Sequence, residues 1–262
     1  MPDCCAPIAF FDSGLGGISV LRETVKTLPL ENYLYFGDSL HAPYGTKTPQ
    51  EVVELTMQAA QQLLEAGVKA LVVACNTATA AAIRPLRKAY PGMAIVGTEP
   101  AIKPAVERHP GGRILMMATA MTVKEEKFQK LKAQYDDQAQ IIPIACSGLM
   151  EYVEQGILRG PEVEGYLLDK LEPYLKVPID AIVLGCTHYP FLRAAIRRIV
   201  GRRPEIIDGS FGIAKQLQRR LEEQKLLNPG PGPGRVEFSN SLDEPEILEL
   251  SQALFSYEDG AL

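Results

Sequence analysis

The stretches LVVACNTATA (Leu71–Ala80) and AIVLGCTHYP (Ala181–Pro190) share one pattern, although they lie in different halves of the 262-residue chain. In each, a short apolar run ends at a cysteine, Cys75 or Cys186, and small polar residues follow. Four to eight apolar residues bounded by such signals are typical of a buried strand in a parallel sheet. The repeated pattern therefore predicts two strands of the same kind, each carrying a thiol at its carboxyl end.

A second pair of segments repeats at a similar offset. IAFFDSG (Ile8–Gly14) corresponds to ILMMATA (Ile114–Ala120), with apolar residues opposite apolar ones and Ser13 opposite Thr119. Each half of the chain thus contains one strand that ends in Ser or Thr and a later strand that ends in Cys. We therefore expect two similar α/β lobes.

Strand-like and helix-like segments alternate along the chain, which is typical of open parallel sheets covered by helices on both faces. The expected strands are Ile8–Phe11, Tyr33–Phe36, Ala70–Ala74, Ala94–Val96, Ile114–Met117, Gln140–Ile144, Ala181–Leu184 and Glu205–Ile207. The expected helices are Ile18–Thr27, Pro49–Glu65, Thr77–Lys88, Val123–Ala133, Glu162–Leu171, Leu192–Ile199 and Ile213–Gln224. Thr48 and Glu51 form a capping-box pattern at the start of the second helix. The proline- and glycine-rich segment Asn228–Gly234 is predicted to be a surface connector, followed by a last strand and a last helix.

The order of these segments predicts two discontinuous lobes. The first comprises residues 1–97 together with 208–262, and the second comprises residues 98–207. The expected fold class is α/β, with two similar open parallel-sheet lobes and the active site in the cleft between them.

Charge, hydropathy and cysteine content argue against several classes of protein. The net charge is −5 and there is no long run of Lys or Arg, so nucleic acid is not an expected partner. No apolar run approaches the roughly 20 residues of a membrane span, and no secretory signal pattern is found, so we expect a cytoplasmic protein without a membrane partner. The five cysteines include no CxxC pair, so neither a disulfide framework nor a metal site is expected. Cys146 is predicted to be a small buried side chain, and Cys4 and Cys5 are given no role.

Ligands of open α/β sheets bind beyond the carboxyl ends of the strands. Four such ends carry polar clusters here: Asp12-Ser13, Cys75-Asn76-Thr77, Thr119 to Thr122, and Cys186-Thr187-His188. If the two lobes face each other, these clusters line one cleft with a cysteine on each wall.

Two opposed thiols suit one kind of chemistry. A thiol ordinarily titrates near pH 8.5, and a helix N-terminus favours its thiolate. One thiolate can remove a proton from carbon while the opposite thiol donates a proton to the other face, which inverts a stereocentre. The surrounding hydroxyl and amide groups can bind the carboxylates and ammonium of an amino acid. The glycines of DSGLGG (Asp12–Gly17) allow backbone N–H groups to approach an anion, although the loop taken alone is better explained as a tight strand-to-helix turn.

Five segments follow one another along the chain in this order: FDSGLGGISVLRE, YFGDSLHAPYG, VVACNTATA, TEPAIKPA and LGCTHYP. In these segments the chain resembles the glutamate racemase branch of the aspartate/glutamate racemase family. The resemblance runs from Ile8 to the last helix. It implies cofactor-independent interconversion of L- and D-glutamate, with D-glutamate supplied to peptidoglycan synthesis. It also implies glutamate as the small-molecule partner, and it is compatible with a homodimer.

The resemblance assigns roles by position. Cys75 and Cys186 match the two proton donors and acceptors, the first acting on D-glutamate and the second on L-glutamate. Asp12 matches a residue that assists Cys75, His188 matches one that assists Cys186, and Glu154 matches a further assisting carboxylate. The residues that match substrate-binding positions are Asp12, Ser13, Pro43, Tyr44, Gly45, Asn76, Thr77, Thr119, Thr122, Thr187 and His188.

Two segments depart from the family pattern. Ser39-Leu40-His41 stand where Thr-Ala-Arg is more frequent, and the prolines usual before Glu154 are missing. Glu154 lies in a helical stretch with Glu151, where a solvated helix face is the competing interpretation. Asp38 is expected either to cap a turn or to support the site, and His41 is given no role.

Three alternatives remain open at this stage. A phosphate-binding α/β enzyme would use DSGLGG as an anion loop, but the chain lacks a P-loop lysine. A two-lobed protein that only binds a small ligand would not need thiols in its cleft. A racemase of another amino acid, such as aspartate, is the nearest alternative.

Overall fold

The computed structural model describes residues 3–124 and 126–258, and the chain divides into two compact units. Unit 1 comprises Met1–Thr98 and Ser210–Ser256, and unit 2 comprises Glu99–Gly209 and Tyr257–Leu262. Each unit is built on one sheet whose strand pairs are all parallel. The prediction of two parallel-sheet lobes surrounded by helices is confirmed.

The sheet of unit 1 has the strand order β4-β3-β1-β2-β9. Its strands are β1 (Ile8–Asp12), β2 (Tyr33–Gly37), β3 (Ala70–Val73), β4 (Ala94–Gly97) and β9 (Val236–Asn240). Strand β1 is buried along its whole length and pairs with β2 on one side and β3 on the other. The carboxyl ends of these three central strands therefore lie next to one another.

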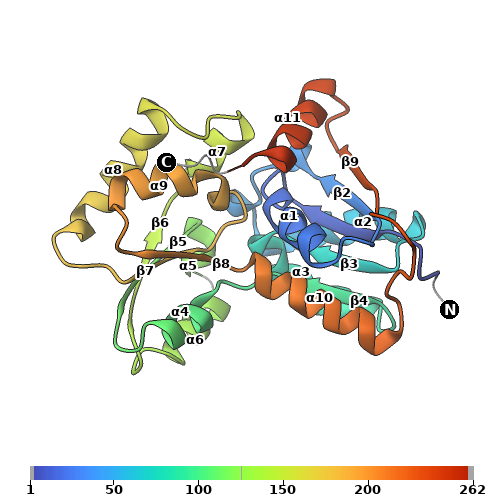
Figure 1. Cartoon of the computed structure of the whole chain (residues 1–262), viewed down its shortest axis with the longest axis horizontal. Helices are drawn as coiled ribbons and strands as arrows, with labels where there is room; N and C mark the ends of the chain where they lie inside the picture. The colour runs from blue at the N-terminus through green and yellow to red at the C-terminus, as the bar shows by residue number, and fades with distance from the viewer. Residues whose placement is uncertain (1–2, 125, 259–262) are drawn as a thin grey trace. The chain divides into compact units, whose positions relative to one another are not determined.

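Helices cover both faces of this sheet (Figure 1). They are α1 (Ile18–Thr27), α2 (Pro49–Glu65), α3 (Asn76–Ala89), α10 (Ser210–Gln224) and α11 (Pro245–Ser256), with two short 3-10 helices, η1 (Ser39–His41) and η2 (Tyr44–Thr46). Helix α1 packs against α10 and α11, while α2 packs against α3. The two groups of helices lie on opposite faces because β–α–β crossovers are right-handed. The β1–α1–β2 crossover runs across the sheet in one direction, whereas β2–α2–β3 and β3–α3–β4 run in the other, so α1 covers one face and α2 and α3 cover the opposite face.

The sheet of unit 2 has the strand order β6-β5-β7-β8. Its strands are β5 (Arg113–Ala118), β6 (Gln140–Ala145), β7 (Ala181–Leu184) and β8 (Glu205–Asp208). With β5 taken as the equivalent of β1 and β7 as the equivalent of β3, this is the order β2-β1-β3-β4 of unit 1. The repeat seen in the sequence thus corresponds to a repeated strand order.

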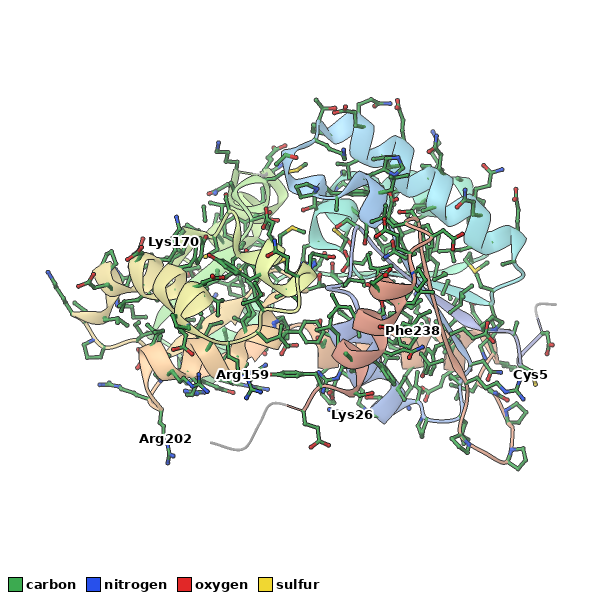
Figure 2. All side chains as sticks on the ribbon, turned by 90° about the horizontal axis from the view of Figure 1, so that it is seen from above. Cys5, Lys26, Arg159, Lys170, Arg202 and Phe238 are labelled. Atoms are coloured by element: carbon green, nitrogen blue, oxygen red, sulfur yellow. The ribbon has the colours of Figure 1, made fainter. Side chains whose placement is uncertain are left out.

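Two groups of helices flank the second sheet (Figure 1). They are α4 (Ile102–Arg108), α5 (Ala120–Lys124) and α6 (Glu126–Ala133) on one face, and α7 (Leu149–Glu154), α8 (Pro161–Leu175), η3 (Tyr189–Leu192) and α9 (Arg193–Val200) on the other. A core cluster joins Ile102 and Val106 of α4 and Phe128 of α6 to Met116 of β5 and Val183 of β7. Charged side chains such as Arg202 project outward (Figure 2).

Local signals in the sequence account for several boundaries. Thr48 Oγ1 accepts a hydrogen bond from Glu51 N, and the Glu51 carboxylate accepts one from Thr48 N at 2.8 Å, so the predicted capping box begins α2. Helix α4 was not predicted from the sequence; it contains Pro104 in its first turn, where the missing N–H removes no helical hydrogen bond. The predicted helix Val123–Ala133 corresponds to α5 and α6, and residue 125 between them lies outside the described residues.

The segment Asn228–Gly234 contains neither helix nor strand, as predicted for a connector. Among the described residues, no helix is long and apolar enough to cross a membrane.

Candidate functional site

Three polar residues meet at the carboxyl edge of the unit 1 sheet. Asp12 ends β1, Ser13 follows it, and Cys75 lies two residues after β3. All three are at least nine-tenths buried, with exposures of 0% for Asp12, 5% for Ser13 and 6% for Cys75. Because β1 and β3 are paired, residues 62 positions apart in the chain come into contact.

Ser13 connects the thiol to the carboxylate. Its Oγ lies 3.3 Å from Cys75 Sγ and 3.1 Å from Asp12 Oδ1, and its backbone N donates to the same carboxylate oxygen at 2.6 Å. When the hydroxyl donates its hydrogen to Asp12, its oxygen can accept one from the Cys75 thiol. A continuous hydrogen-bonded path then runs from sulfur to carboxylate, so Asp12 is placed to act on Cys75 through Ser13.

Cys75 occupies the N-cap position of α3. Its Sγ accepts a hydrogen bond from Ala78 N at 3.5 Å. Unpaired N–H groups and the positive end of the helix dipole favour negative charge at this position. The helix start therefore favours a thiolate on Cys75.

Gly17 is required at the start of α1 by close packing. A Cβ at this position would lie 2.9 Å from Asp12 Cβ, 2.9 Å from Asp12 Oδ2 and 2.8 Å from Ala74 Cβ. The last glycine of DSGLGG therefore lets the helix start approach the Asp12 side chain, which is a more specific reason than the tight turn considered from the sequence.

A second polar group adjoins this edge. Tyr44 Oη donates to Asp38 Oδ2 at 2.6 Å, and His41 Nδ1 lies 2.8 Å from Asp38 Oδ1. Burial raises the pKa of the Tyr44 phenol far above its ordinary value, and the hydrogen bond to Asp38 adds to this, so Tyr44 remains a neutral donor. Pro43 precedes Tyr44 and Gly45 follows it within η2.

Of the two readings of Asp38, these contacts favour site support. His41 was given no role in the sequence analysis, yet it contacts the carboxylate that holds Tyr44. The spacing of Asp38 and His41, three residues apart, is the signal that could have indicated the contact.

Asn76 and Thr77 lie in the first turn of α3. Thr77 is 4% exposed. The Asn76 Oδ1 atom is buried and, among the described residues, has no hydrogen-bond partner. Because such an acceptor is costly to leave unpaired, it is suited to an N–H donor of a ligand, such as an ammonium group.

Unit 2 contains the second thiol in a comparable position. Cys186 follows β7 and is 8% exposed. Its Sγ lies 3.6 Å from His188 Nδ1, and His188 Nε2 lies 2.5 Å from Glu154 Oε1 at the end of α7. The structure thus places Glu154, which the resemblance gave only as a further assisting carboxylate, against the His188 side chain that contacts Cys186.

Two opposing effects act on the pKa of His188. Burial lowers it, but the hydrogen bonds to Cys186 and to Glu154 outweigh burial and raise it well above the ordinary value. These contacts favour the protonated form of His188, which can stabilise a thiolate on Cys186.

The remaining predicted residues of unit 2 lie near the ends of its central strands. Thr119 follows β5, and its Oγ1 accepts a hydrogen bond from Thr122 N at 3.2 Å and donates one to Thr122 Oγ1 at 3.0 Å. Thr122 and Thr187 are buried, at 4% and 8% exposure. The hydroxyl groups of Thr119 and Thr122 are held by each other at the start of α5.

Cys146 is buried, as predicted, and it follows the carboxyl end of β6. Burial raises the pKa of its thiol to about 12, nearby Lys170 lowers it and Cys186 raises it. Tyr189 Oη donates to Cys146 O at 3.0 Å. Cys146 is therefore a neutral thiol at physiological pH and is not suited to act as a base.

Neither thiol site has the geometry of a metal centre. Within the part of the chain that the structure describes, one group of three or more His, Cys, Asp or Glu side chains has mutually close ligand atoms, namely Asp3, Cys4 and Cys5. None of these is a predicted site residue.

Comparisons with known proteins agree with the fold. Residues 16–214 match the model of the Asp/Glu/hydantoin racemase family. A glutamate racemase of Clostridium perfringens is 49% identical over 249 residues, which cover 95% of this chain and 96% of that protein.

Two solved structures are also similar. Escherichia coli glutamate racemase, in complex with L-glutamate and the activator UDP-MurNAc-ala, superposes with a TM-score of 0.84 at 28% identity and covers 95% of each chain. Glutamate racemase of Francisella tularensis, in complex with D-glutamate, gives a TM-score of 0.82 at 26% identity and covers 98% of this chain and 96% of that one. With its two parallel sheets and these relatives, the chain belongs to the Asp/Glu/hydantoin racemase family and, within it, to the glutamate racemases, which are amino-acid racemases.

Proposed function

We propose that this protein interconverts L- and D-glutamate without a cofactor, using Cys75 and Cys186 as two acid–base groups. The observation that carries the proposal is the equivalence of the two thiols: each follows the same strand of a repeated sheet, and each is linked to a carboxylate through one intervening side chain. The intervening side chain is Ser13 in unit 1 and His188 in unit 2.

In the L-to-D direction, the Cys186 thiolate removes the α-proton of L-glutamate and becomes a thiol. The raised pKa of His188 supports this starting state, because an imidazolium beside the sulfur stabilises the thiolate. The electron pair left on Cα delocalises into the α-carboxylate. The Cys75 thiol then donates its proton to the opposite face and becomes a thiolate, which yields D-glutamate.

The reverse reaction exchanges these roles. Cys75 as thiolate removes the α-proton of D-glutamate, and Cys186 as thiol donates. Both thiols must regain their starting protonation before the next turnover in the same direction. The Ser13–Asp12 path and the His188–Glu154 path are suited to this exchange, because each leads from sulfur to a carboxylate.

Glutamate is the proposed substrate because the relatives named above act on it, as their names state, and two of them hold L- or D-glutamate. The unpaired oxygen of Asn76 suits the substrate ammonium. The hydroxyl groups of Ser13, Thr119, Thr122 and Thr187 suit its carboxylates.

The mechanism requires Cys75 and Cys186 to reach opposite faces of one substrate molecule, one from each lobe. The lobe boundaries expected from the sequence, 1–97 with 208–262 and 98–207, stay a proposal, and they differ from the two compact units in placing residues 257–262 in the first lobe. A role in supplying D-glutamate for peptidoglycan, a cytoplasmic location and a homodimer stay predictions.

The test is incubation of chelator-treated, dialysed protein with L-glutamate, followed by chiral separation of the product. We expect a racemic mixture at equilibrium. Parallel incubation with L-aspartate separates the alternatives, because preferred turnover of aspartate would contradict the assigned substrate. Full activity in a Cys75→Ser or Cys186→Ser variant would contradict the two-thiol mechanism. It would not contradict the assignment of the protein as a racemase.

A further inference from the structure

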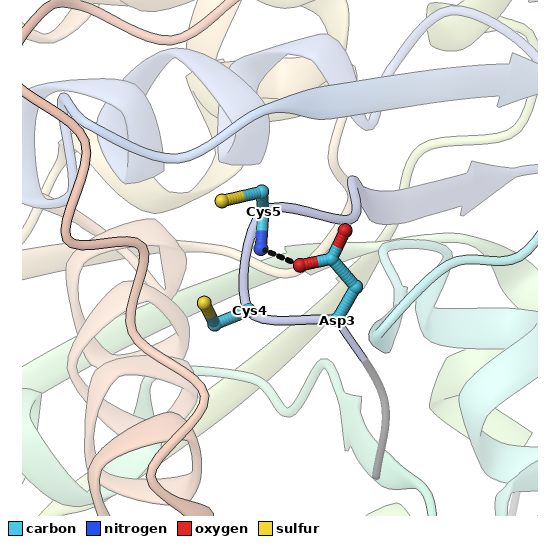
Figure 3. A group of neighbouring side chains, drawn as sticks. All are labelled: Asp3, Cys4 and Cys5. Carbon is cyan, nitrogen blue, oxygen red and sulfur yellow. Dashed lines mark hydrogen bonds between the residues drawn. The ribbon is translucent and has the colours of Figure 1, made fainter.

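Three potential metal ligands lie together in the turn that precedes β1. The carboxylate of Asp3 and the sulfur atoms of Cys4 and Cys5 offer one ligand atom each, and all three atoms lie within 4.8 Å of one another. Figure 3 shows both sulfur atoms on the same side of the turn. The thiols are accessible, since Cys5 is exposed (Figure 2) and Cys4 is partly exposed.

This ligand set suits a particular class of ion. Thiolates select soft or borderline cations, and zinc in proteins is held by Cys sulfur and Asp or Glu oxygen in tetrahedral geometry. Two sulfur ligands at about 2.3 Å from zinc lie about 3.8 Å apart at the tetrahedral angle. In the turn, the three ligand atoms already lie within 4.8 Å of one another, and the Asp3 carboxylate has to rotate away from Cys5 N to join the two sulfur atoms.

We propose that Asp3, Cys4 and Cys5 form a binding site for a thiophilic divalent cation of the zinc class. Two thiolates and one carboxylate supply three ligands, and water completes the tetrahedron. The sequence analysis did not predict this site because it searched for CxxC spacing, whereas here the ligands are consecutive residues brought together by one turn.

The backbone of the turn is held by one internal hydrogen bond and by contacts to two other segments of unit 1. Asp3 Oδ1 accepts a hydrogen bond from Cys5 N at 2.9 Å, and Asn32 Nδ2 donates to Cys5 O at 2.9 Å. Lys69 Nζ donates to Cys4 O and also pairs with the buried carboxylate of Glu31. A fixed backbone lowers the entropy that the ligands lose when they gather around an ion.

One side-chain contact connects the turn to the connector after α10: Cys5 Sγ donates to Asn228 Oδ1 at 3.7 Å.

The site lies away from the Cys75 thiol within unit 1. Asp3, Cys4 and Cys5 precede the amino end of β1, while Asp12, Ser13 and Cys75 lie at the carboxyl edge of the same sheet. The five residues of β1 separate the two regions by about 15 Å. A bound ion would therefore stabilise the conformation of the N-terminal turn rather than take part in proton transfer.

The experiment uses full-length protein reduced with a phosphine, so that no added thiol competes for metal. Co²⁺ is titrated as a spectroscopic substitute for Zn²⁺, and sulfur-to-cobalt charge-transfer absorption is recorded. We expect one ion per chain in the wild type and in the Cys75→Ser/Cys186→Ser double variant. We expect the signal to disappear in the Cys4→Ser/Cys5→Ser double variant and the affinity to fall at least about tenfold in Asp3→Asn.

A second readout is thermal unfolding with and without Zn²⁺. The melting temperature of the Cys75→Ser/Cys186→Ser variant should rise with Zn²⁺, and that of a variant lacking Cys4 and Cys5 should not. Charge-transfer absorption that persists in Cys4→Ser/Cys5→Ser, or none in the wild type, would overturn the proposal. Racemisation by the metal-free protein is measured separately, so failure of this site and failure of the proposed function are distinguishable.

Discussion

His188 Nε2 lies 2.5 Å from Glu154 Oε1, although the two residues are 34 positions apart and belong to different segments of unit 2. The other ring nitrogen, Nδ1, lies 3.6 Å from Cys186 Sγ. The imidazole thus connects the Glu154 carboxylate to the Cys186 thiol. Removing the carboxylate tests this connection without altering the imidazole or the thiol.

Glu154→Gln should lower kcat about tenfold to hundredfold, which is less than the roughly 10²–10⁴-fold that a direct acid–base group contributes. The reason is that glutamine keeps the size of the side chain and removes the negative charge that stabilises the His188 imidazolium. Steady-state rates in both directions provide the measurement. Glu151→Gln is the matched control, since Glu151 is exposed on the same helix and should leave the rate unchanged.

The same pair predicts a pH dependence of stability. The folded-state pKa of His188 lies well above its ordinary value, so its proton is bound more tightly in the folded than in the unfolded protein. This stabilisation is fully present below about pH 6.5, the ordinary value for histidine, and is lost as pH rises through the folded-state pKa. The difference in unfolding free energy between wild type and Glu154→Gln should therefore shrink as pH rises from 6 to 9. A difference in urea denaturation that stays constant or grows over this range would contradict the assignment.

Tyr44→Phe should destabilise the protein by about 1–3 kcal/mol, because it removes the hydroxyl that donates to the buried Asp38 carboxylate. It should also raise KM for glutamate, since η2 loses an anchor next to the proposed substrate-binding residues. Tyr90→Phe, at a partly buried tyrosine in the C-cap of α3, is the control for the loss of a hydroxyl. A variant that unfolds like the wild type would show that Asp38 does not depend on Tyr44.

Lys69→Met should cost about 3–5 kcal/mol of unfolding free energy. The Lys69 ammonium pairs with the Glu31 carboxylate, and both side chains are almost completely buried, so the substitution leaves a buried charge without its partner. By contrast, Lys26→Ala breaks an exposed pair with Glu23 and should change stability by less than about 1 kcal/mol. Urea denaturation of the two variants compares them directly, and equal effects would be evidence against the burial argument.

Much of the fold follows from local sequence signals. Thr48, Pro49 and Glu51 specify the start of α2 through a capping box, and the apolar runs before Cys75 and Cys186 specify β3 and β7. The boundaries of α1 and α2 agree with those expected from the sequence. Helix α4 was not predicted, because its seven residues are too few to show a clear periodicity and include a proline.

The candidate site was predictable only in part. Residues directly after strands could be assigned to the carboxyl edge from their position alone. Contacts such as Ser13–Cys75 and Glu154–His188 depend on strand order and helix packing, which no local pattern specifies. The Asp38–Tyr44 contact is local, but its significance depends on burial that the sequence does not reveal.

The two-thiol mechanism makes a sharp prediction about isotopes. When L-glutamate is converted in heavy water and the reaction is stopped early, Cys186 removes the α-hydrogen from one face. The S–H group of Cys75 has already exchanged with solvent, so Cys75 donates deuterium to the opposite face. The D-glutamate formed should therefore carry deuterium at Cα almost completely.

The unreacted L-glutamate should at the same time contain little deuterium, because the hydrogen held on Cys186 returns to the face from which it came. A single base that served both faces would transfer the original hydrogen to the product, and the substrate would have to turn over within the site, which proximity requirements disfavour. Mass spectrometry of the separated enantiomers distinguishes these cases. Early D-glutamate that retains hydrogen at Cα would exclude two independent thiols, even in a protein that racemises glutamate.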